Sequence, residues 1–351
     1  RMSDILVLPF VMLMILAGPA ERFMPRLACR IFLQPEALSP YCHLDPAQAS
    51  FGAHISYERI RWTEVRHEIW RLGRSIMLEG MRIARFSFND RPQYAFVQHD
   101  DADDKDYLIA LDGYPLSAQT VKPTGERHAV DGDGVRLLAP VIPSKVYGLA
   151  KNYQAHTAFM AESGMSDITE PPERMMIFAK PSTAVIGPDD PIVYPSYSKQ
   201  MCYEPEVAVV IGRIAKNVPE DKAMDYVLGF TCVNDVTLRD LQQGDPMWTR
   251  SKGFDTSCPL GPWIETDLDY ANAPISFSLN GRDVPEASGN TSNLIHSIPE
   301  QIAFISSFST LLPGDVIMTG TPHASGSLAP RDEAVVHIEG IGSLRNVVVS
   351  A

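Results

Sequence analysis

The chain has 351 residues, of which 45% are hydrophobic, 21% charged and 9% aromatic, an ordinary composition for a globular protein. This composition excludes wholesale disorder and a membrane bundle. The formal net charge of −13, with no cluster of Lys and Arg, argues against a nucleic-acid-binding protein, because phosphate contacts need a concentrated basic surface. The negative charge leaves open the possibility of an acidic enzyme that holds a divalent cation.

Residues 1–80 differ from the rest of the chain in charge and pattern. They contain nine Arg, no Lys and eight acidic residues, so the negative balance lies entirely in residues 81–351. An apolar run from Ile5 to Gly18 has the length of a signal-peptide core but is too short to span a bilayer comfortably. Three interpretations stay open: a segment foreign to the natural protein, which we favour, an export or anchor signal, and a genuine additional segment.

The cysteines favour a reducing compartment. There are five, at positions 29, 42, 202, 232 and 258, with no C-x-x-C pair and no spacing typical of a zinc site or a disulfide framework. We therefore expect reduced thiols in a cytoplasmic protein.

A small β-rich module is predicted over residues 81–137. Short strands are expected over 81–88, 94–98 and 107–111, with a turn at Asn89 and Asp90. Pro140 and Pro143 then indicate a linker, because neither fits inside a helix or a central strand. A second domain is expected over residues 138–351.

In this second domain strands outnumber helices. Strands are predicted over 145–150, 175–179, 204–212, 227–234, 275–280, 316–319 and 334–338. Helical spacing is clear only over 219–226 and 294–311. Strands and helices do not alternate regularly, and no dinucleotide- or phosphate-binding glycine motif occurs. The sequence therefore predicts an α+β, predominantly β fold rather than a Rossmann or barrel architecture.

Two glutamates stand at the start of the predicted strand 204–212. Glu204 and Glu206 lie two residues apart, so the two-residue period of a strand places both on one face. Asp235 follows the strand 227–234, and pairing of the two strands could bring it to the same place. Three carboxylates with room for water or substrate suit Mg²⁺ or Mn²⁺. The alternative is a solvated strand face without a metal.

Candidate substrate-holding residues follow Asp235. If residues 236–243 form a helical turn, Arg239 and Gln242 lie on the side of Asp235 and can hold a carboxylate or oxo group. Lys252 can offer a positive charge to a developing enolate. Taken alone, Lys252 could equally be a surface lysine in a loop.

Together, these segments resemble the motifs of the fumarylacetoacetate hydrolase family. The resemblance covers about residues 138–350, in the family's order. The motifs are KVYGLAKNYQAH (145–156), FAKPS (178–182), YEPE (203–206), ND (234–235), RDLQ (239–242), KGFD (252–255), PLGPW (259–263) and TGTP (319–322).

The resemblance implies a mixed β-sheet roll, usually assembled as a homodimer, with Mg²⁺ or Mn²⁺ held by Glu204, Glu206 and Asp235. It also implies small-molecule substrates, namely 2-oxo acids and 1,3-dicarbonyl compounds. Members of the family hydrolyse C–C bonds, decarboxylate or tautomerise through an enolate that the metal stabilises.

The same resemblance assigns the substrate-binding residues. Arg239 and Gln242 resemble the family's substrate-holding pair, and Gly320 with Thr321 resembles its carboxylate-binding turn. Lys180, in the FAKPS motif, is also expected to bind substrate.

Lys252 and His156 are the expected catalytic residues. His156 matches the family's histidine that activates water for hydrolysis or moves a proton in isomerisation. The sequence departs from the family at Phe159, where many members have a Glu that orients this histidine. Whether Glu162 can replace that partner stays open, and a histidine without a carboxylate is a poorer base.

The leading hypothesis is therefore a divalent-metal-dependent enzyme that hydrolyses a C–C bond in an acylpyruvate- or fumarylacetoacetate-like substrate. The alternative is a tautomerase or decarboxylase of a 2-oxo-diacid, which Phe159 makes more credible. A third possibility is a catalytically silent protein that binds a metal or a small acid. We expect neither nucleic acid nor membrane as a partner.

Overall fold

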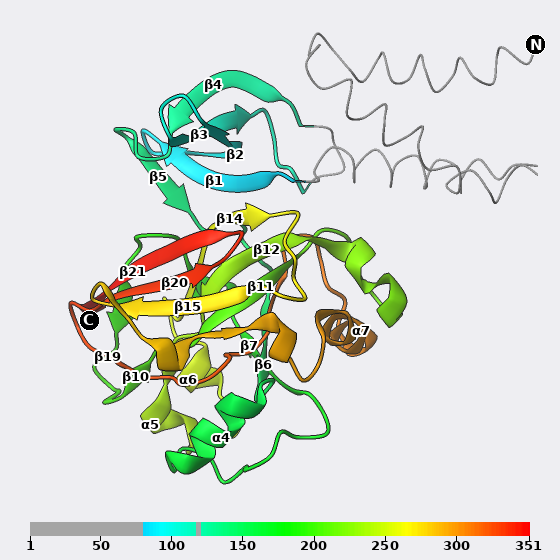
Figure 1. The fold of residues 1–351 in the computed structure, drawn as a ribbon, viewed down its shortest axis with the longest axis vertical. Helices are drawn as coiled ribbons and strands as arrows, with labels where there is room; N and C mark the ends of the chain where they lie inside the picture. The colour runs from blue at the N-terminus through cyan, green and yellow to red at the C-terminus, as the bar shows by residue number, and fades with distance from the viewer. Residues whose placement is uncertain (1–79, 117–120) are drawn as a thin grey trace, which may run out of the picture. The chain divides into compact units, whose positions relative to one another are not determined.

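The computed structural model describes residues 80–116 and 121–351 (Figure 1). The three interpretations of the N-terminal segment concern residues that lie outside these ranges. In the described part strands predominate over helices, which confirms the predicted α+β, predominantly β class. No helix within these ranges is long and apolar enough to cross a membrane.

The first five strands form an antiparallel group. They are β1 (Arg82–Phe88), β2 (Arg91–Asp100), β3 (Lys105–Leu111), β4 (Pro123–Ala129) and β5 (Val135–Leu138). Asn89 and Asp90 have φ angles of +48° and +63°, the left-handed backbone of a two-residue turn between twisted strands. The sequence did not predict β4, because it is a largely exposed edge strand whose residues are mostly polar.

These strands continue directly into the main sheet. Its order is β4-β3-β2-β1-β14-β12-β11-β18-β6-β7. The added strands are β6 (Val146–Ala150), β7 (Met176–Lys180), β11 (Pro205–Ile211), β12 (Val227–Asn234), β14 (Cys258–Glu265) and β18 (Val316–Met318), and the short β8 (Val185–Ile186) also pairs with β14. β1 pairs with β14 through Ile83 and Ile264. The segment around Pro140 therefore joins two parts of one sheet.

Two smaller sheets complete the strand structure of residues 80–116 and 121–351. One has the order β16-β15-β20-β21-β9, with β17 paired to β15, and the other has the order β13-β10-β19. Their strands are β9 (Ile192–Tyr194), β10 (Met201–Cys202), β13 (Thr237–Leu238), β15 (Pro274–Leu279), β16 (Arg282–Asp283), β17 (Gly289–Asn290), β19 (Ser327–Leu328), β20 (Glu333–Ile338) and β21 (Gly342–Ser350).

The hydrophobic core lies where β15, β20 and β21 pack against β11 and β12 (Figure 1). β11 is buried along its whole length, with Val207 to Ile211 completely inaccessible. Phe277 of β15 and Val336 of β20 belong to the same core. Burial of such apolar side chains contributes about 1.5–3 kcal/mol each to folding stability. β11 therefore holds the residues at its start in fixed positions.

Helices in the described part of the chain are short and few. They are α4 (Gln154–Glu162), α5 (Arg239–Gln242), α6 (Thr249–Lys252) and α7 (Ile298–Phe308), with 3₁₀ segments η2 (Ser182–Ala184), η3 (Glu220–Tyr226), η4 (Pro285–Ala287) and η5 (Thr291–Asn293). The helix predicted over 294–311 begins only at Ile298, because Ser297 and Glu300 form a capping box there. The predicted helical turn over 236–243 is shorter, since Thr237 and Leu238 form strand β13.

Candidate active site

Two neighbouring strands bring the three predicted acidic residues together. Glu204 precedes β11, Glu206 lies within it and Asp235 follows β12. The antiparallel register pairs Pro205 with Asn234, and the Asp235 N–H donates to the Glu204 carbonyl at 2.8 Å. All three carboxylates are buried, and their ligand atoms lie within 4.8 Å of one another.

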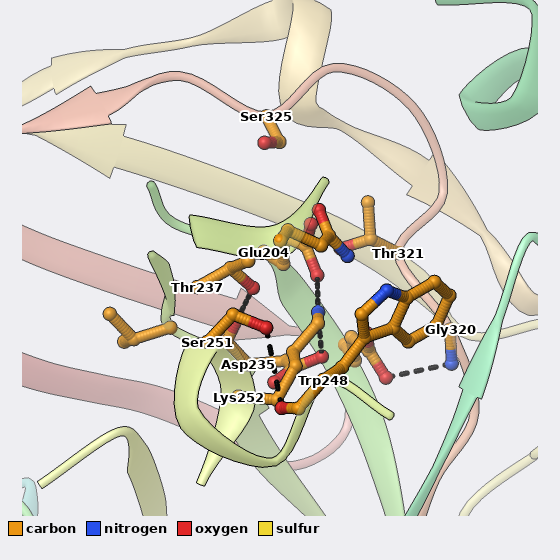
Figure 2. Close-up of polar contacts among 12 residues, drawn as sticks. Glu204, Asp235, Thr237, Trp248, Ser251, Lys252, Gly320, Thr321 and Ser325 are labelled. Atoms are coloured by element: carbon orange, nitrogen blue, oxygen red, sulfur yellow. Dashed lines mark hydrogen bonds and ion pairs between the residues drawn. The ribbon is translucent and has the colours of Figure 1, made fainter. Parts of the chain in front are cut away.

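Lys252, at the end of α6, lies between two of these carboxylates (Figure 2). Its Nζ is 2.5 Å from Glu204 Oε2 and 2.5 Å from Asp235 Oδ2. Burial alone would lower the pKa of Lys252, but the charges of Asp235 and Glu204 raise it above its usual value. Lys252 therefore carries a positive charge at the acidic cluster, and it is not a surface lysine.

Arg239 supports Glu204 from α5. Its Nη2 donates to Glu204 Oε1 and, at 2.6 Å, to Ser325 Oγ, while Nη1 donates to Gln242 Oε1 at 2.6 Å. Burial raises the pKa of Glu204, but Lys252 and Arg239 outweigh this effect and hold it well below its usual range. Glu204 is thus ionised although it is buried.

Glu206 and Asp235 fit a divalent cation. Burial, followed by the charges of Asp235 and Glu204, raises the pKa of Glu206 well above its usual value, as expected for a buried carboxylate beside two others. Asp235 Oδ1 is buried without a hydrogen bond; Lys180 Nζ is 2.8 Å away, but not in hydrogen-bond geometry. An all-oxygen donor set of this kind suits a hard cation.

His156 lies in α4 and is 7% exposed. Its Nδ1–H donates to the backbone carbonyl of His323 at 2.5 Å, which leaves Nε2 as the basic nitrogen. Burial is the main cause that lowers its pKa to about 4. Phe159 packs near the His323 ring, with 6.3 Å between ring centroids, and Glu162 is exposed at the end of α4. In the described residues no hydrogen bond or ion pair joins His156 to a carboxylate.

A cavity of about 520 Å³ unites most of the predicted site. Its wall includes the predicted residues His156, Glu204, Glu206, Arg239, Gln242, Lys252 and Thr321. The loop after α4 adds Met165, Ser166, Asp167 and Ile168, and β6 with its following residue adds Leu149, Ala150 and Lys151. The remaining lining residues are Met160, Gln243 and Trp248. Cavities of this size hold small molecules.

Two predicted substrate-binding residues have other partners. Lys180 is 1% exposed and does not line the cavity, since its Nζ donates to the carbonyls of Val236, Lys252 and Ser257. This position does not fit substrate binding. The N–H of Gly320 donates to Glu206 Oε2 at 2.7 Å, so it orients a carboxylate of the protein (Figure 2).

Two residues of the site were not singled out from the sequence. Ser325 anchors Arg239, but nothing in the local pattern around residue 325 indicates that role. Lys151 directly follows β6 and lines the cavity. Its position at the end of a strand, beside the Asn152-Tyr153 motif, could have indicated a functional role, because functional side chains concentrate in the loops that follow strands.

Comparisons with known proteins identify the family of this chain. The family model described as fumarylacetoacetate (FAA) hydrolase C-terminal matches residues 145–349, which is more than half of the chain. The chain belongs to the fumarylacetoacetate hydrolase family. A second model, described as Rv2993c-like, N-terminal, matches residues 81–140. Family membership confirms the resemblance seen in the sequence and makes the protein a member of an enzyme family.

Three similar proteins have informative names. The mitochondrial oxaloacetate tautomerase Fahd2a of Rattus norvegicus is 38% identical over 227 residues, 61% of this chain and 70% of the relative. A crystal structure of 2-hydroxyhepta-2,4-diene-1,7-dioate isomerase from Mycobacterium marinum is 38% identical, with a TM-score of 0.68, and the match covers 77% of this chain and 98% of that one. A fumarylpyruvate hydrolase from Pseudomonas aeruginosa, in complex with Mn²⁺ and pyruvate, is 30% identical, with a TM-score of 0.54 and coverage of 63% and 94%.

Proposed function

We propose that this protein is a metal-dependent tautomerase, an isomerase that interconverts the enol and keto forms of a 2-oxo acid. The observation that carries the proposal is the hydrogen bond of His156, whose Nδ1–H is held by a backbone carbonyl instead of a carboxylate. A carboxylate partner stabilises the imidazolium cation, and a neutral carbonyl in a buried site does so far less. His156 is therefore a weak base, and the imidazolium that it forms on taking a proton gives that proton up readily.

Such a histidine suits tautomerisation better than hydrolysis. C–C hydrolysis requires a base that takes a proton from water, whereas the hydroxyl of an enol is much more acidic than water. In the proposed reaction the enol O–H bond breaks and its proton passes to Nε2 of His156. The C–O bond becomes a carbonyl, the C=C electron pair forms a new C–H bond, and the imidazolium supplies that proton. No water or other co-reactant is consumed.

The remaining residues of the cavity bind and orient the substrate. We propose that Glu204, Glu206 and Asp235 hold Mg²⁺ or Mn²⁺, which would polarise the oxygens of the 2-oxo acid. Lys252 places a positive charge where the oxygen becomes negative. Arg239 is held in place by Ser325 and Glu204 and can bind a substrate carboxylate next to them.

The metal assignment has its own test. Calorimetric titration with Mg²⁺ compares the wild type with Asp235→Ala, which removes one of the three carboxylates. We expect the affinity to fall by at least about tenfold, because one charged ligand is lost. Unchanged affinity would contradict the proposed ligand set.

The names of similar proteins support an isomerase more than a hydrolase. The rat relative is a tautomerase by name, and the M. marinum protein is an isomerase by name. The P. aeruginosa protein is named a hydrolase and has lower identity to this chain. Hydrolysis of an acylpyruvate, the leading expectation from sequence, is therefore kept as an outcome of the experiment.

The experiment measures three reactions on one Mg²⁺-loaded preparation. Ketonisation of enol-oxaloacetate is followed by the loss of enol absorbance, while product analysis detects cleavage of acylpyruvates and decarboxylation of oxaloacetate. His156→Gln should slow ketonisation at least about a hundredfold, the usual contribution of a general acid–base. The matched control is His337→Gln, because His337 is exposed in β20 and absent from the cavity wall.

Each outcome has a definite meaning. Ketonisation that depends on both Mg²⁺ and His156 supports the proposal. Acylpyruvate cleavage that is faster than ketonisation identifies a hydrolase and refutes it. No turnover on any of these compounds favours a catalytically silent binding protein.

A further inference from the structure

Lys151 has an unusual backbone conformation at the edge of the cavity. It directly follows β6 with a φ of +58°, in the left-handed region that non-glycine residues adopt only a few per cent of the time. Such conformations cost about 1–3 kcal/mol and cluster at functional sites. The strained backbone directs a lysine to the cavity wall.

The ammonium group of Lys151 has a neutral partner. Its Nζ donates to Ser166 Oγ at 2.7 Å, and in the described residues no carboxylate forms an ion pair with it. Burial, followed by the positive charge of Arg239, lowers its pKa. Asp167 also lines the cavity, but it is partly open to solvent, which screens its charge. The wall therefore presents positive charge that the protein itself does not neutralise.

The buried charges around the acidic cluster are already balanced without Lys151. With all three carboxylates ionised, the state that binds a metal, Glu204, Glu206 and Asp235 are matched in number by Lys180, Lys252 and Arg239, whose ion pairs are with Glu204 and Asp235. A divalent metal ion would add two positive charges to this neutral set. A 2-oxo acid with one carboxylate would cancel one of them, and one with two carboxylates would cancel both.

We infer that Lys151 binds the second carboxylate of the substrate and makes the enzyme selective for 2-oxo-dicarboxylic acids. The inference rests on the proposed function, since it requires a 2-oxo acid at the acidic cluster. The first carboxylate and the oxo group then lie at the Glu204 end of the cavity, and the second carboxylate reaches Lys151 and the hydroxyl of Ser166. A volume of about 520 Å³ leaves room for diacids longer than four carbons.

The test uses pairs of acids that differ only in this carboxylate. 2-Oxoglutarate is compared with 2-oxopentanoate, and oxaloacetate with 2-oxobutanoate, so that a methyl group replaces the second carboxylate in each pair. Affinities of the Mg²⁺-loaded protein are measured by calorimetry for the first pair. For the second pair, KM of oxaloacetate is compared with the inhibition constant of 2-oxobutanoate.

Three variants are measured beside the wild type. Lys151→Met removes the charge and keeps the length, Lys151→Arg keeps the charge, and Lys222→Met is the control in an exposed lysine of η3. Lys151→Met should weaken diacid binding by about tenfold, the value of one charge-assisted hydrogen bond at a partly exposed site. Binding of the monoacids should change by less than about twofold, and Lys151→Arg should retain most of the diacid preference.

Two results would overturn the inference. One is an equal loss for diacids and monoacids in Lys151→Met, and the other is a diacid preference that survives in this variant. Failure of the proposed function looks different, because it is seen in turnover: ketonisation of enol-oxaloacetate is then absent or slower than acylpyruvate cleavage, whichever acids bind.

Discussion

Lys180 provides the sharpest test of how the site is held together. It ends β7 and is 1% exposed, and its ammonium group has no contact with the cavity. Nζ donates to the carbonyls of Val236 at 3.2 Å and Ser257 at 2.9 Å and to that of Lys252, and it lies 2.8 Å from Asp235 Oδ1. One ammonium thus ties β7 to the segments that carry Asp235 and Lys252.

The substitution Lys180→Met should be strongly destabilising. Methionine has nearly the length of the lysine stem, so the volume lost is small, and the cost comes from the acceptors left without a donor. Each buried acceptor without its partner costs about 1–3 kcal/mol. Removing one member of a buried ion pair costs about 3–5 kcal/mol. These terms overlap, and we expect a loss of about 4 kcal/mol in the free energy of unfolding.

Urea denaturation measures this loss. With a slope of about 2–3 kcal/mol per molar, the midpoint should fall by about 1.5 M. Lys222→Met, at an exposed lysine of η3, should leave the midpoint within about 0.2 M of the wild type. Mg²⁺ affinity is the second measurement, and it should fall by at least about tenfold because Asp235 loses its support.

Two outcomes would refute this reasoning. A loss of less than about 1 kcal/mol with normal Mg²⁺ affinity would mean that the contacts of Lys180 contribute little. Normal stability with a raised KM alone would mean that Lys180 binds substrate, as the FAKPS motif suggested.

Three further predictions concern other parts of the site. Phe159→Glu should place a carboxylate near His156 and raise the pKa of that histidine above about 4. Acylpyruvate cleavage should then increase relative to ketonisation by at least about tenfold. An unchanged ratio of the two products would contradict this prediction. Burial raises the pKa of Asp240, but hydrogen bonds from Lys199 N–H and the Ser198 hydroxyl outweigh burial and lower it below its ordinary value of 3.8. The contribution of Asp240 to the free energy of unfolding is therefore present above pH 3.8 and is lost in stronger acid. Asp240→Asn should therefore cost about 1 kcal/mol or less at pH 7, given its exposure, and the difference from wild type in urea titrations should shrink as the pH falls below the ordinary value of 3.8. Burial raises the pKa of the Cys258 thiol to about 12, so peptide mapping should find it unmodified after iodoacetamide treatment of the native protein and modified after unfolding.

The sequence predicted the acidic cluster because strand geometry is local and regular. The two-residue period fixes Glu204 and Glu206 on one face, and a strand predicted over 227–234 corresponds to β12 with the same bounds. Pairing of β11 with β12 was the one tertiary assumption needed to bring Asp235 to them. These positions follow from backbone hydrogen bonds, which do not depend on side-chain detail.

Other elements could not be predicted from local pattern. β14 contains Pro259, Gly261 and Pro262, which argue against a strand, yet it lies between β1 and β12 in the main sheet. The helical turn expected directly after Asp235 was wrong at its start, because Thr237 and Leu238 pair with β10. In both places tertiary pairing outweighs local preference.

The placement of positive side chains was harder to predict than that of the acids. Lys180 and Lys252 are both long side chains near apolar segments, and the sequence does not indicate which ammonium faces the cavity. The structure separates them by what surrounds each Nζ: three backbone carbonyls and Asp235 Oδ1 away from the cavity for Lys180, and two carboxylates at the cavity for Lys252. Side-chain direction in a folded core depends on packing from several segments at once.

The acidic residues of the site and its other functional side chains come from different structural elements, and this has a chemical consequence. The acids come from paired strands whose geometry the sheet ladder fixes, whereas His156, Lys151 and Ser166 come from α4 and the segments that flank it. Metal binding should therefore tolerate changes in α4 and in the loop after it. The choice of reaction depends on the partner of His156, and the choice of substrate depends on Lys151, so the two properties should change independently. Combining Phe159→Glu with Lys151→Met tests this directly: additive effects on product ratio and diacid preference are expected, since within the described part of the chain no hydrogen bond or ion pair connects the two side chains.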